Sequence, residues 1–236
     1  MNQLYLTILF PLIGFLILVS ARKRLSENVA AIVGVGSVGL AALFAGLAGY
    51  DFLNNAPASG AFVQPLWTWV NVAGFAPAFN LHLDGLSLTM LGVITGVGFL
   101  IHLFASWYMR GDEDFARFFS YMNLFLASMI LLVLGDSLVS LYFGWEGVGL
   151  CSYLLIGYYY RDPANGAAAR KAFVVTRVGD AFMAIGLFII YNELGTLNIQ
   201  EVLKLAPTEF AIGGFAITFA TLMLLGGAVG KSAQLP

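Results

Sequence analysis

Long apolar runs alternate with short polar segments along the whole chain. An α-helix crosses a hydrocarbon core about 30 Å thick in about 20 residues. Seven runs approach or exceed that length, and they cover residues 3–20, 29–50, 85–109, 115–134, 138–160, 172–191 and 211–230. The pattern predicts an all-α integral membrane protein, a multi-helix bundle with about seven transmembrane helices.

Two segments between these runs have patterns of their own. Residues 51–84 alternate apolar and polar positions, contain turn residues and include two tryptophans, which predicts a short external hairpin at the membrane interface. Residues 197–210 read LNIQEVLKLAPTEF, a pattern typical of a short amphipathic helix lying along the outer surface. Neither segment indicates a soluble domain.

The composition agrees with a bilayer as the solvent. The 236 residues are 60% hydrophobic and only 10% charged, with a mean hydropathy of +0.87, whereas soluble domains carry about 25% charged residues. The lone cysteine, Cys151, excludes an internal disulfide and a cysteine-held metal cluster in this sequence. The sequence also has no CxxC, HExxH or Walker motif. We therefore expect no cofactor in this chain and no nucleic-acid partner.

One motif of soluble enzymes occurs inside an apolar run. Residues 34–39, GVGSVG, match the dinucleotide-binding pattern GxGxxG. That pattern requires a preceding strand and a βαβ unit, but here the flanking residues 29–50 are continuously apolar. We interpret these glycines as a close-packing face of a membrane helix.

Basic residues are concentrated on one side of the predicted bundle. The connections after the first, third and fifth runs, with the start of the fourth, contain Arg22, Lys23, Arg24, Arg110, Arg117, Arg161, Arg170 and Lys171. The segments 51–84 and 192–210 on the other side contain a single basic residue, Lys204. The positive-inside rule makes the basic side cytoplasmic and the N-terminus non-cytoplasmic.

Few ionisable side chains lie inside the apolar runs, and each is a candidate functional group because burying it in a bilayer costs at least about 2.5 kcal/mol. They are Glu146, Arg177, Asp180, His102 and Lys231. Glu146 is the strongest candidate. It lies eight residues from the outer end of its helix, roughly 12 Å at 1.5 Å per residue, which is too deep for its short side chain to reach the interface. The neighbouring Gly144, Gly147 and Gly149 leave room for a helix backbone or for water.

The other buried charges leave alternatives open. Arg177 and Asp180 are spaced i, i+3 and can pair on one helix face, either as an anchor of the helix or as a polar entrance for protons. Lys231 reads from the pattern as a cytoplasmic anchor, or as part of a broken helix because glycines precede it. His102 reads as a packing histidine.

Four motifs together resemble a known family. They are LDGLSLTM from residue 83, GWEGVGLCSYLLIG from residue 144, KAFVVTRVGD from residue 171 and LLGGAVGKSAQLP from residue 224. In this order and spacing they resemble the antiporter-like subunits of proton-pumping NADH:quinone oxidoreductase, respiratory complex I, and GWEGVGLCSYLLIG and VVTRVGD favour the subunit L type. The resemblance runs from residue 4 to residue 236.

The resemblance implies a fold and a set of functional residues. The fold would consist of two inverted five-helix repeats, of which this chain holds an incomplete part. Residues 1–110 would form the first three transmembrane helices with the external loop 51–84, and residues 111–236 the start of the first repeat. Glu146 would pair with Lys231 in a broken helix near the midplane, and Arg177 and Asp180 would belong to the cytoplasmic proton input. The ending GKSAQLP indicates a chain cut within an element.

The resemblance also implies an activity and an assembly. The chain would move protons through Glu146, Lys231, Asp180 and Arg177, as a subunit of an enzyme complex in a bacterial-type inner membrane. NADH, flavin, Fe–S clusters and quinone would belong to partner subunits, and the partners would be other membrane-arm subunits, especially a neighbouring antiporter-like subunit, and the bilayer. A subunit of a multisubunit sodium/proton antiporter or of a membrane-bound hydrogenase is the alternative, and a purely structural role with static charge pairs is a third.

Overall fold

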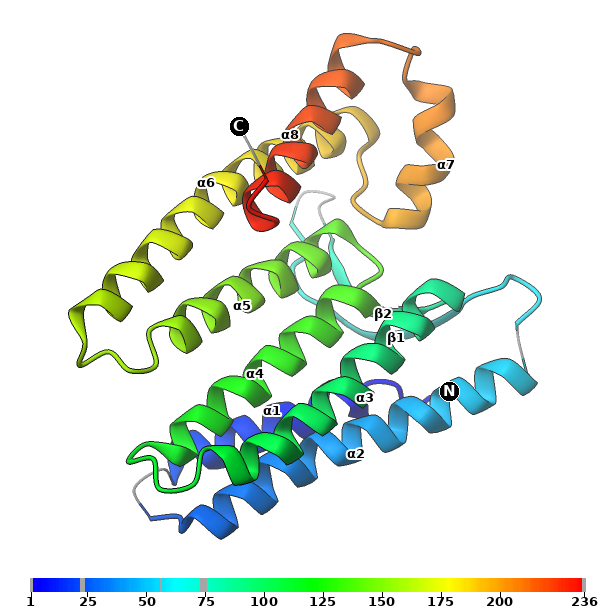
Figure 1. Ribbon diagram of the computed structural model, residues 1–236. Helices are drawn as coiled ribbons and strands as arrows, with labels where there is room; N and C mark the ends of the chain where they lie inside the picture. Colours follow the sequence, from blue (N-terminus) through cyan, green and yellow to red (C-terminus); the bar gives the residue numbers. More distant parts are fainter. Residues whose placement is uncertain (1, 22–23, 56, 73–75, 235–236) are drawn as a thin grey trace.

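The computed structural model describes residues 2–21, 24–55, 57–72 and 76–234 as a helical bundle with one β hairpin (Figure 1). Its elements in chain order are α1 (Leu6–Ser20), α2 (Glu27–Asn54), β1 (Phe62–Thr68), β2 (Ala78–Leu83), α3 (Gly85–Tyr108), α4 (Phe115–Leu134), α5 (Leu138–Ile156), α6 (Pro163–Leu194), α7 (Ile199–Glu209) and α8 (Phe215–Lys231). Each of the seven apolar runs contains a helix. The predicted hairpin is confirmed as an antiparallel pair of β1 and β2.

The first four helices form a bundle with an apolar core. One cluster of buried side chains at the hairpin end joins α2, α3, α4 and β2 around Leu91, Ile130 and Leu81. A second cluster at the opposite end joins α1, α2, α3 and α4 around Leu18 and Phe119. Burial of these side chains fixes the arrangement of the four helices, against which α5 then packs.

Glycines set the spacing of the later helices. A Cβ atom on Gly144 of α5 would lie 2.6 Å from the backbone nitrogen of Leu132 on α4. A Cβ atom on Gly179 of α6 would lie 3.1 Å from the Cα atom of Gly230 on α8. At both crossings backbone lies against backbone, and any other residue would push the helices apart.

The two ends of the bundle are formed by different kinds of segment. The connections α1–α2, α3–α4 and α5–α6 lie at one end, and the hairpin, the α4–α5 turn and α7 lie at the other (Figure 1). At the first end Arg110 donates a hydrogen bond to Asn28 at 2.6 Å and so joins the end of α3 to the start of α2. Arg22 and Lys23 lie outside the described residues. The chain thus separates its basic connections from its hairpin.

Three sequence expectations change in detail. Five of the described helices, α2 to α6, are long and apolar enough to cross a membrane, whereas α1 and α8 are shorter apolar helices, so the count of about seven spans is not confirmed. The fifth helix ends at Ile156 instead of residue 160. The sixth helix begins at Pro163 instead of residue 172, because the Asp162 side chain caps it there. Its first turns are polar, so the apolar run did not include them.

The glycine motif of residues 34–39 is confirmed as part of a helix, α2. A Cβ atom on Gly34 would lie 2.6 Å from the ring of Phe119 on α4, and one on Gly39 would lie 3.0 Å from the ring of Phe99 on α3. These glycines therefore serve helix packing.

Candidate functional site

Glu146 lies midway along α5, on a helix whose glycines admit its neighbours. Gly144 and Gly147 allow α4 to approach, since Cβ atoms there would lie 2.6 Å from the Leu132 backbone nitrogen and from Ser128 Oγ. This confirms the expectation that the glycines beside the acid admit a helix backbone. The Glu146 side chain is 26% exposed in the described chain. Its carboxylate is directed to α6.

Arg177 of α6 connects two carboxylates. Its Nη1 atom forms ion pairs with Oε2 of Glu146 and with Oδ2 of Asp180, the latter at 3.4 Å. The predicted i, i+3 pair of Arg177 and Asp180 is therefore confirmed. The guanidinium also lies over the ring of Phe173, 4.4 Å from its centroid. Because a guanidinium stays protonated, Arg177 supplies a permanent positive charge between the two acids.

The predicted pair of Glu146 and Lys231 is not formed in this structure. Lys231 Nζ donates a hydrogen bond to the backbone oxygen of Trp145 at 2.9 Å and lies 5.3 Å from the centroid of the Trp145 ring. No ion pair joins Lys231 to Glu146 in the described part of the chain. The physical reason is that Arg177 occupies the Glu146 carboxylate. Lys231 instead meets a carbonyl dipole and an aromatic face of α5.

Gly149 permits this contact. A Cβ atom at this position would lie 2.9 Å from Lys231 Nζ and 3.7 Å from Arg177 Nη2. The missing side chain leaves space on α5 for both cationic groups. Lys231 is also the last residue of α8, which ends beside the middle of α6 (Figure 1). Its ammonium group lies against the middle of α5 and not at one of the basic connections.

Trp145 is a site residue that the sequence interpretation missed. Its indole Nε1 donates to Asp180 Oδ1 at 2.6 Å, while its carbonyl accepts from Lys231. Asp180 is buried, with 2% of its side chain exposed. The Tyr142 hydroxyl also donates to the Asp180 backbone oxygen at 3.4 Å. A tryptophan far from both interfaces and next to a buried acid was the available signal in the sequence.

These groups form one continuous polar chain through three helices, here called the charged chain. It runs from Glu146 through Arg177, Asp180 and Trp145 to Lys231, with each contact given above. It contains two carboxylates that can accept protons and one ammonium that can release a proton. The arrangement can hold charge in an apolar bundle.

Other ionisable groups lie apart from this chain. His102 on α3 is buried, its Nδ1 lies 2.7 Å from the Gly98 backbone oxygen, and its ring packs near that of Phe119. These contacts agree with a packing histidine. Within the described ranges, no group of three His, Cys, Asp or Glu side chains is placed to hold a metal ion.

Comparisons with known proteins agree with this fold. Residues 135–236 match the family described as NADH:quinone oxidoreductase/Mrp antiporter, TM, and residues 69–119 match NADH-ubiquinone oxidoreductase (complex I), chain 5 N-terminus. The fold resembles a chain of the archaeal membrane-bound sulfane sulfur reductase with a TM-score of 0.81, at 18% identity over 97% of this chain and 44% of that one. It resembles a chain of the Mrp complex from Dietzia with a TM-score of 0.76, at 23% identity over 98% of this chain and 24% of that one. Residues 135–236 thus belong to the NADH:quinone oxidoreductase/Mrp antiporter family, and both solved structures share the fold.

Curated relatives narrow the class. The chain is 67% identical over its whole length to NADH-quinone oxidoreductase subunit L of Escherichia coli and 65% identical to that of Pseudomonas aeruginosa. It is 43% identical to that of Mycobacterium tuberculosis over 98% of its length. The resemblance to subunit L is thus confirmed for the N-terminal part of that protein. The chain spans about 38% of the length of the first two relatives.

Proposed function

We propose that the chain is the N-terminal part of a proton-translocating membrane-arm subunit of NADH:quinone oxidoreductase. The observation that carries the proposal is the charged chain, which links two carboxylates and a lysine across α5, α6 and α8. Buried charges in apolar helices cost free energy, and such groups usually mark ion or proton pathways. The 67% identity to subunit L names the complex in which that pathway would operate.

Lys231 is the proton-exchanging cation of the proposed mechanism. Arg177 pairs with both carboxylates and itself stays protonated throughout. The Lys231 ammonium is bonded to a neutral carbonyl, so its proton can leave without breaking an ion pair. A proton reaching Asp180 can be exchanged with Lys231 through water beside the Trp145 indole. Glu146 and Asp180 then stabilise the positive charge of Arg177 and, while it is protonated, that of Lys231.

We extend this assignment to membrane, partners and cofactors. The chain lies in a bacterial-type inner membrane with its basic connections in the cytoplasm and its N-terminus outside. Helices α1 and α8 also lie within the bilayer, which gives seven membrane helices of an incomplete inverted-repeat fold. Other membrane-arm subunits, including a neighbouring antiporter-like subunit, are its partners. NADH oxidation, flavin, Fe–S clusters and quinone reduction belong to other subunits.

A subunit of a cation/proton antiporter is the second candidate, because the fold resembles that of the Mrp complex. The two candidates differ in their coupling ion. If sodium replaced protons as the transported ion, transport would depend on sodium concentration and would continue without NADH oxidation. The identity of 67% to subunit L, against 23% to the Mrp chain, favours the first candidate.

The test uses the full-length subunit in its assembled complex, in inside-out membrane vesicles. Proton uptake is followed with a pH-sensitive acridine dye, and NADH oxidation is recorded in parallel. Lys231→Ala is expected to remove most of the proton uptake per NADH oxidised. Lys231→Arg is expected to do the same, since arginine keeps the charge but does not release a proton. Lys204→Ala, on the exposed surface of α7, is the control and keeps full uptake. Wild-type uptake in Lys231→Arg would contradict the proposed role and favour a static charge.

A further inference from the structure

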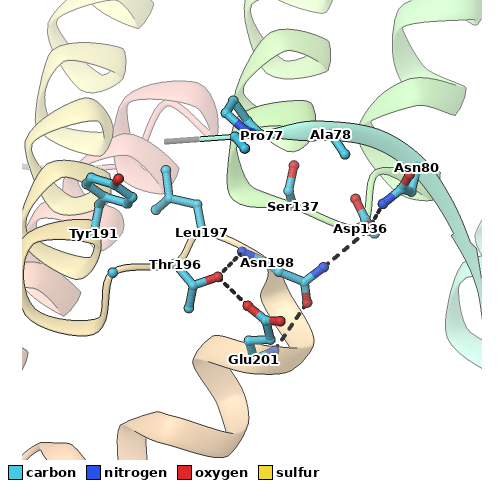
Figure 2. A pocket seen from close by; sticks show the side chains of 12 residues that line it. Pro77, Ala78, Asn80, Asp136, Ser137, Tyr191, Thr196, Leu197, Asn198 and Glu201 are labelled. Atoms are coloured by element: carbon cyan, nitrogen blue, oxygen red, sulfur yellow. Dashed lines mark hydrogen bonds between the residues drawn. The ribbon is translucent and has the colours of Figure 1, made fainter. Parts of the chain in front are cut away.

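A polar pocket of about 270 Å³ lies at the hairpin end of the bundle, apart from the charged chain. Three segments distant in sequence meet around it: β2, the α4–α5 turn and the connection from α6 to α7 (Figure 2). Its polar lining includes Asn80, Asp136, Ser137, Asn198 and Glu201. Since one water takes about 30 Å³ of liquid volume, the pocket has room for several.

Asp136 is held in a fixed position at this pocket. Its backbone nitrogen donates to the Asn80 oxygen at 3.3 Å, and its backbone oxygen accepts from Ile199 at 3.0 Å. Its carboxyl Oδ2 accepts from Asn80 Nδ2 at 2.8 Å and from Asn198 Nδ2 at 3.2 Å. Figure 2 shows both amides directed at this carboxyl group. The residue is 5% exposed.

The second carboxyl oxygen of Asp136 is in a different situation. Oδ1 is buried and receives no hydrogen bond from the residues that the structure describes. Such an atom is costly unless it binds water, a proton or another ligand. Neither lysine nor arginine occurs in the described lining of the pocket, and the other carboxylate there, Glu201, is held by Thr196 Oγ1 at 2.5 Å. No cation of the described pocket lining neutralises the Asp136 charge.

Burial raises the pKa of the Asp136 carboxyl above its usual range, and this effect exceeds the lowering by the Asn80 hydrogen bond and the His82 charge. His82 is itself 3.5 Å from Asp84. The titratable groups around Asp136 are His82 on β2, Asp84 at the start of α3, Tyr191 on α6 and Glu201 on α7. They are mixed in charge, so burial remains the dominant influence.

We propose that Asp136 exchanges protons with the aqueous phase at the hairpin end of the bundle, with Oδ1 as the atom that carries the proton. In the protonated form, Oδ1–H donates to a water molecule that enters when the pocket wall moves outward, because Oδ1 is closed off from the pocket in the resting arrangement. In the ionised form, the amides of Asn80 and Asn198 hold the charge on Oδ2. The step transfers one proton between the carboxyl group and a water molecule.

The position of Asp136 suits an aqueous end point of a proton path. It lies just before α5, whose middle carries Glu146, about 15 Å further along the helix at 1.5 Å per residue. Tyr142 lies between them and donates to the Asp180 backbone. A role in transport rests on the proposed function, whereas the titration of Asp136 does not.

The test combines infrared spectroscopy with proton transport in the complete subunit, assembled in its complex. In the wild type, the carbonyl band of a protonated carboxyl group should titrate at a pH above the ordinary aspartate range. Asp136→Asn should lose this band, keep the hydrogen bonds from both amides, and slow proton uptake several-fold. Asn80→Ala should move the titration to higher pH, because it removes a hydrogen bond to the charged form. Glu201→Gln is the control and should keep the band.

The outcomes separate this inference from the proposed function. Absence of an Asp136-dependent band would overturn the inference, and wild-type proton uptake in Asp136→Asn would overturn the role of this titration in transport. If the band is present while the wild-type complex transports no protons, the proposed function fails and the titration stands. If Asp136→Asn does not assemble, the direction of the Asn80→Ala shift decides: an upward shift supports the inference, and an unchanged titration overturns it.

Discussion

The α1–α4 bundle and the layer formed by α5, α6 and α8 are held together by different physics. In the bundle, apolar side chains such as Leu91 and Ile130 are fully buried against one another. In the layer, α5 meets α6 through an ion pair of Glu146 with Arg177, and α6 meets α8 through glycine backbones. The first arrangement stabilises a fixed shape, whereas the second holds charge in an apolar environment.

This difference indicates where function is concentrated. An apolar core gains free energy from burial alone and carries out no chemistry. A buried charge network is often no more stable than an apolar replacement, so stability alone does not account for it. The layer therefore carries the proposed proton path, and the bundle supports it. Four substitutions test this comparison.

The largest effect is expected from Arg177→Leu. It leaves the half-buried Glu146 and the buried Asp180 without their shared cation, and the cost of up to about 3–5 kcal/mol for a fully buried ion pair is the upper limit of the destabilisation. Proton uptake should fall to background, and thermal unfolding of the purified complex should shift to lower temperature. Arg161→Leu is the control, since the Arg161 side chain is 74% exposed in its pair with Glu113 and such pairs contribute about 0–1 kcal/mol. Equal effects of the two substitutions would remove the distinction between layer and surface.

A core substitution in the bundle should affect stability but not transport. Leu91→Ala removes a fully buried side chain of α3 and should cost about 2–5 kcal/mol. The fraction of complex that assembles should pump protons at the wild-type ratio to NADH oxidised. Leu86→Ala, at an exposed position of the same helix, should leave stability nearly unchanged. A lowered pumping ratio in Leu91→Ala would show that the bundle takes part in transport.

A smaller effect is expected where α6 crosses α8. Gly179→Ala places a Cβ atom 3.1 Å from the Gly230 Cα atom, and overpacking of this kind costs about 1–3 kcal/mol. Displacement of α8 should also move Lys231 away from Trp145 and reduce proton uptake. Gly46→Ala on α2 meets open space and is the matched control. Proton uptake and thermal stability of the two variants, measured together, would separate crowding from helix propensity.

The smallest effect is expected at the α4–α5 turn and depends on pH. The raised pKa of Asp136 means that the folded chain binds this proton more tightly than the unfolded chain. The stabilisation is complete below the ordinary aspartate pKa and is lost as pH rises through the folded pKa. Each tenfold difference in proton affinity between the two states corresponds to about 1.4 kcal/mol. Relative to Asp136→Asn, the wild type should lose thermal stability over this pH range. A pH-independent difference between the two proteins would contradict the raised pKa.

Sequence reasoning succeeded where hydropathy decides the outcome. Helices occur at all seven apolar runs, and the hairpin and α7 lie where the alternation and the amphipathic pattern predicted them. Helix ends were less accurate, because capping by Asp162 extends α6 through polar turns that hydropathy does not recognise.

The partners of the buried charges were harder to predict. Spacing along one helix identified the pair of Arg177 and Asp180 correctly. The partner of Glu146 depends on how α5, α6 and α8 cross, and the crossings are set by glycine contacts that only the fold displays. Asp136 was missed because acidic residues are common in surface turns. Its burial depends on contacts with Asn80 of β2 and with Asn198 at the start of α7, which the sequence does not show.

The contact of Gly179 with Gly230 has a mechanical consequence. Helices that touch through side chains absorb small displacements when those side chains change rotamer. Glycine backbones have no such freedom, so a shift of α8 must be followed by α6 at this crossing. Asp180 directly follows Gly179 in the chain, and Lys231 directly follows Gly230. A displacement of α8 at this crossing would therefore also displace Asp180, and a displacement of α6 would also displace Lys231.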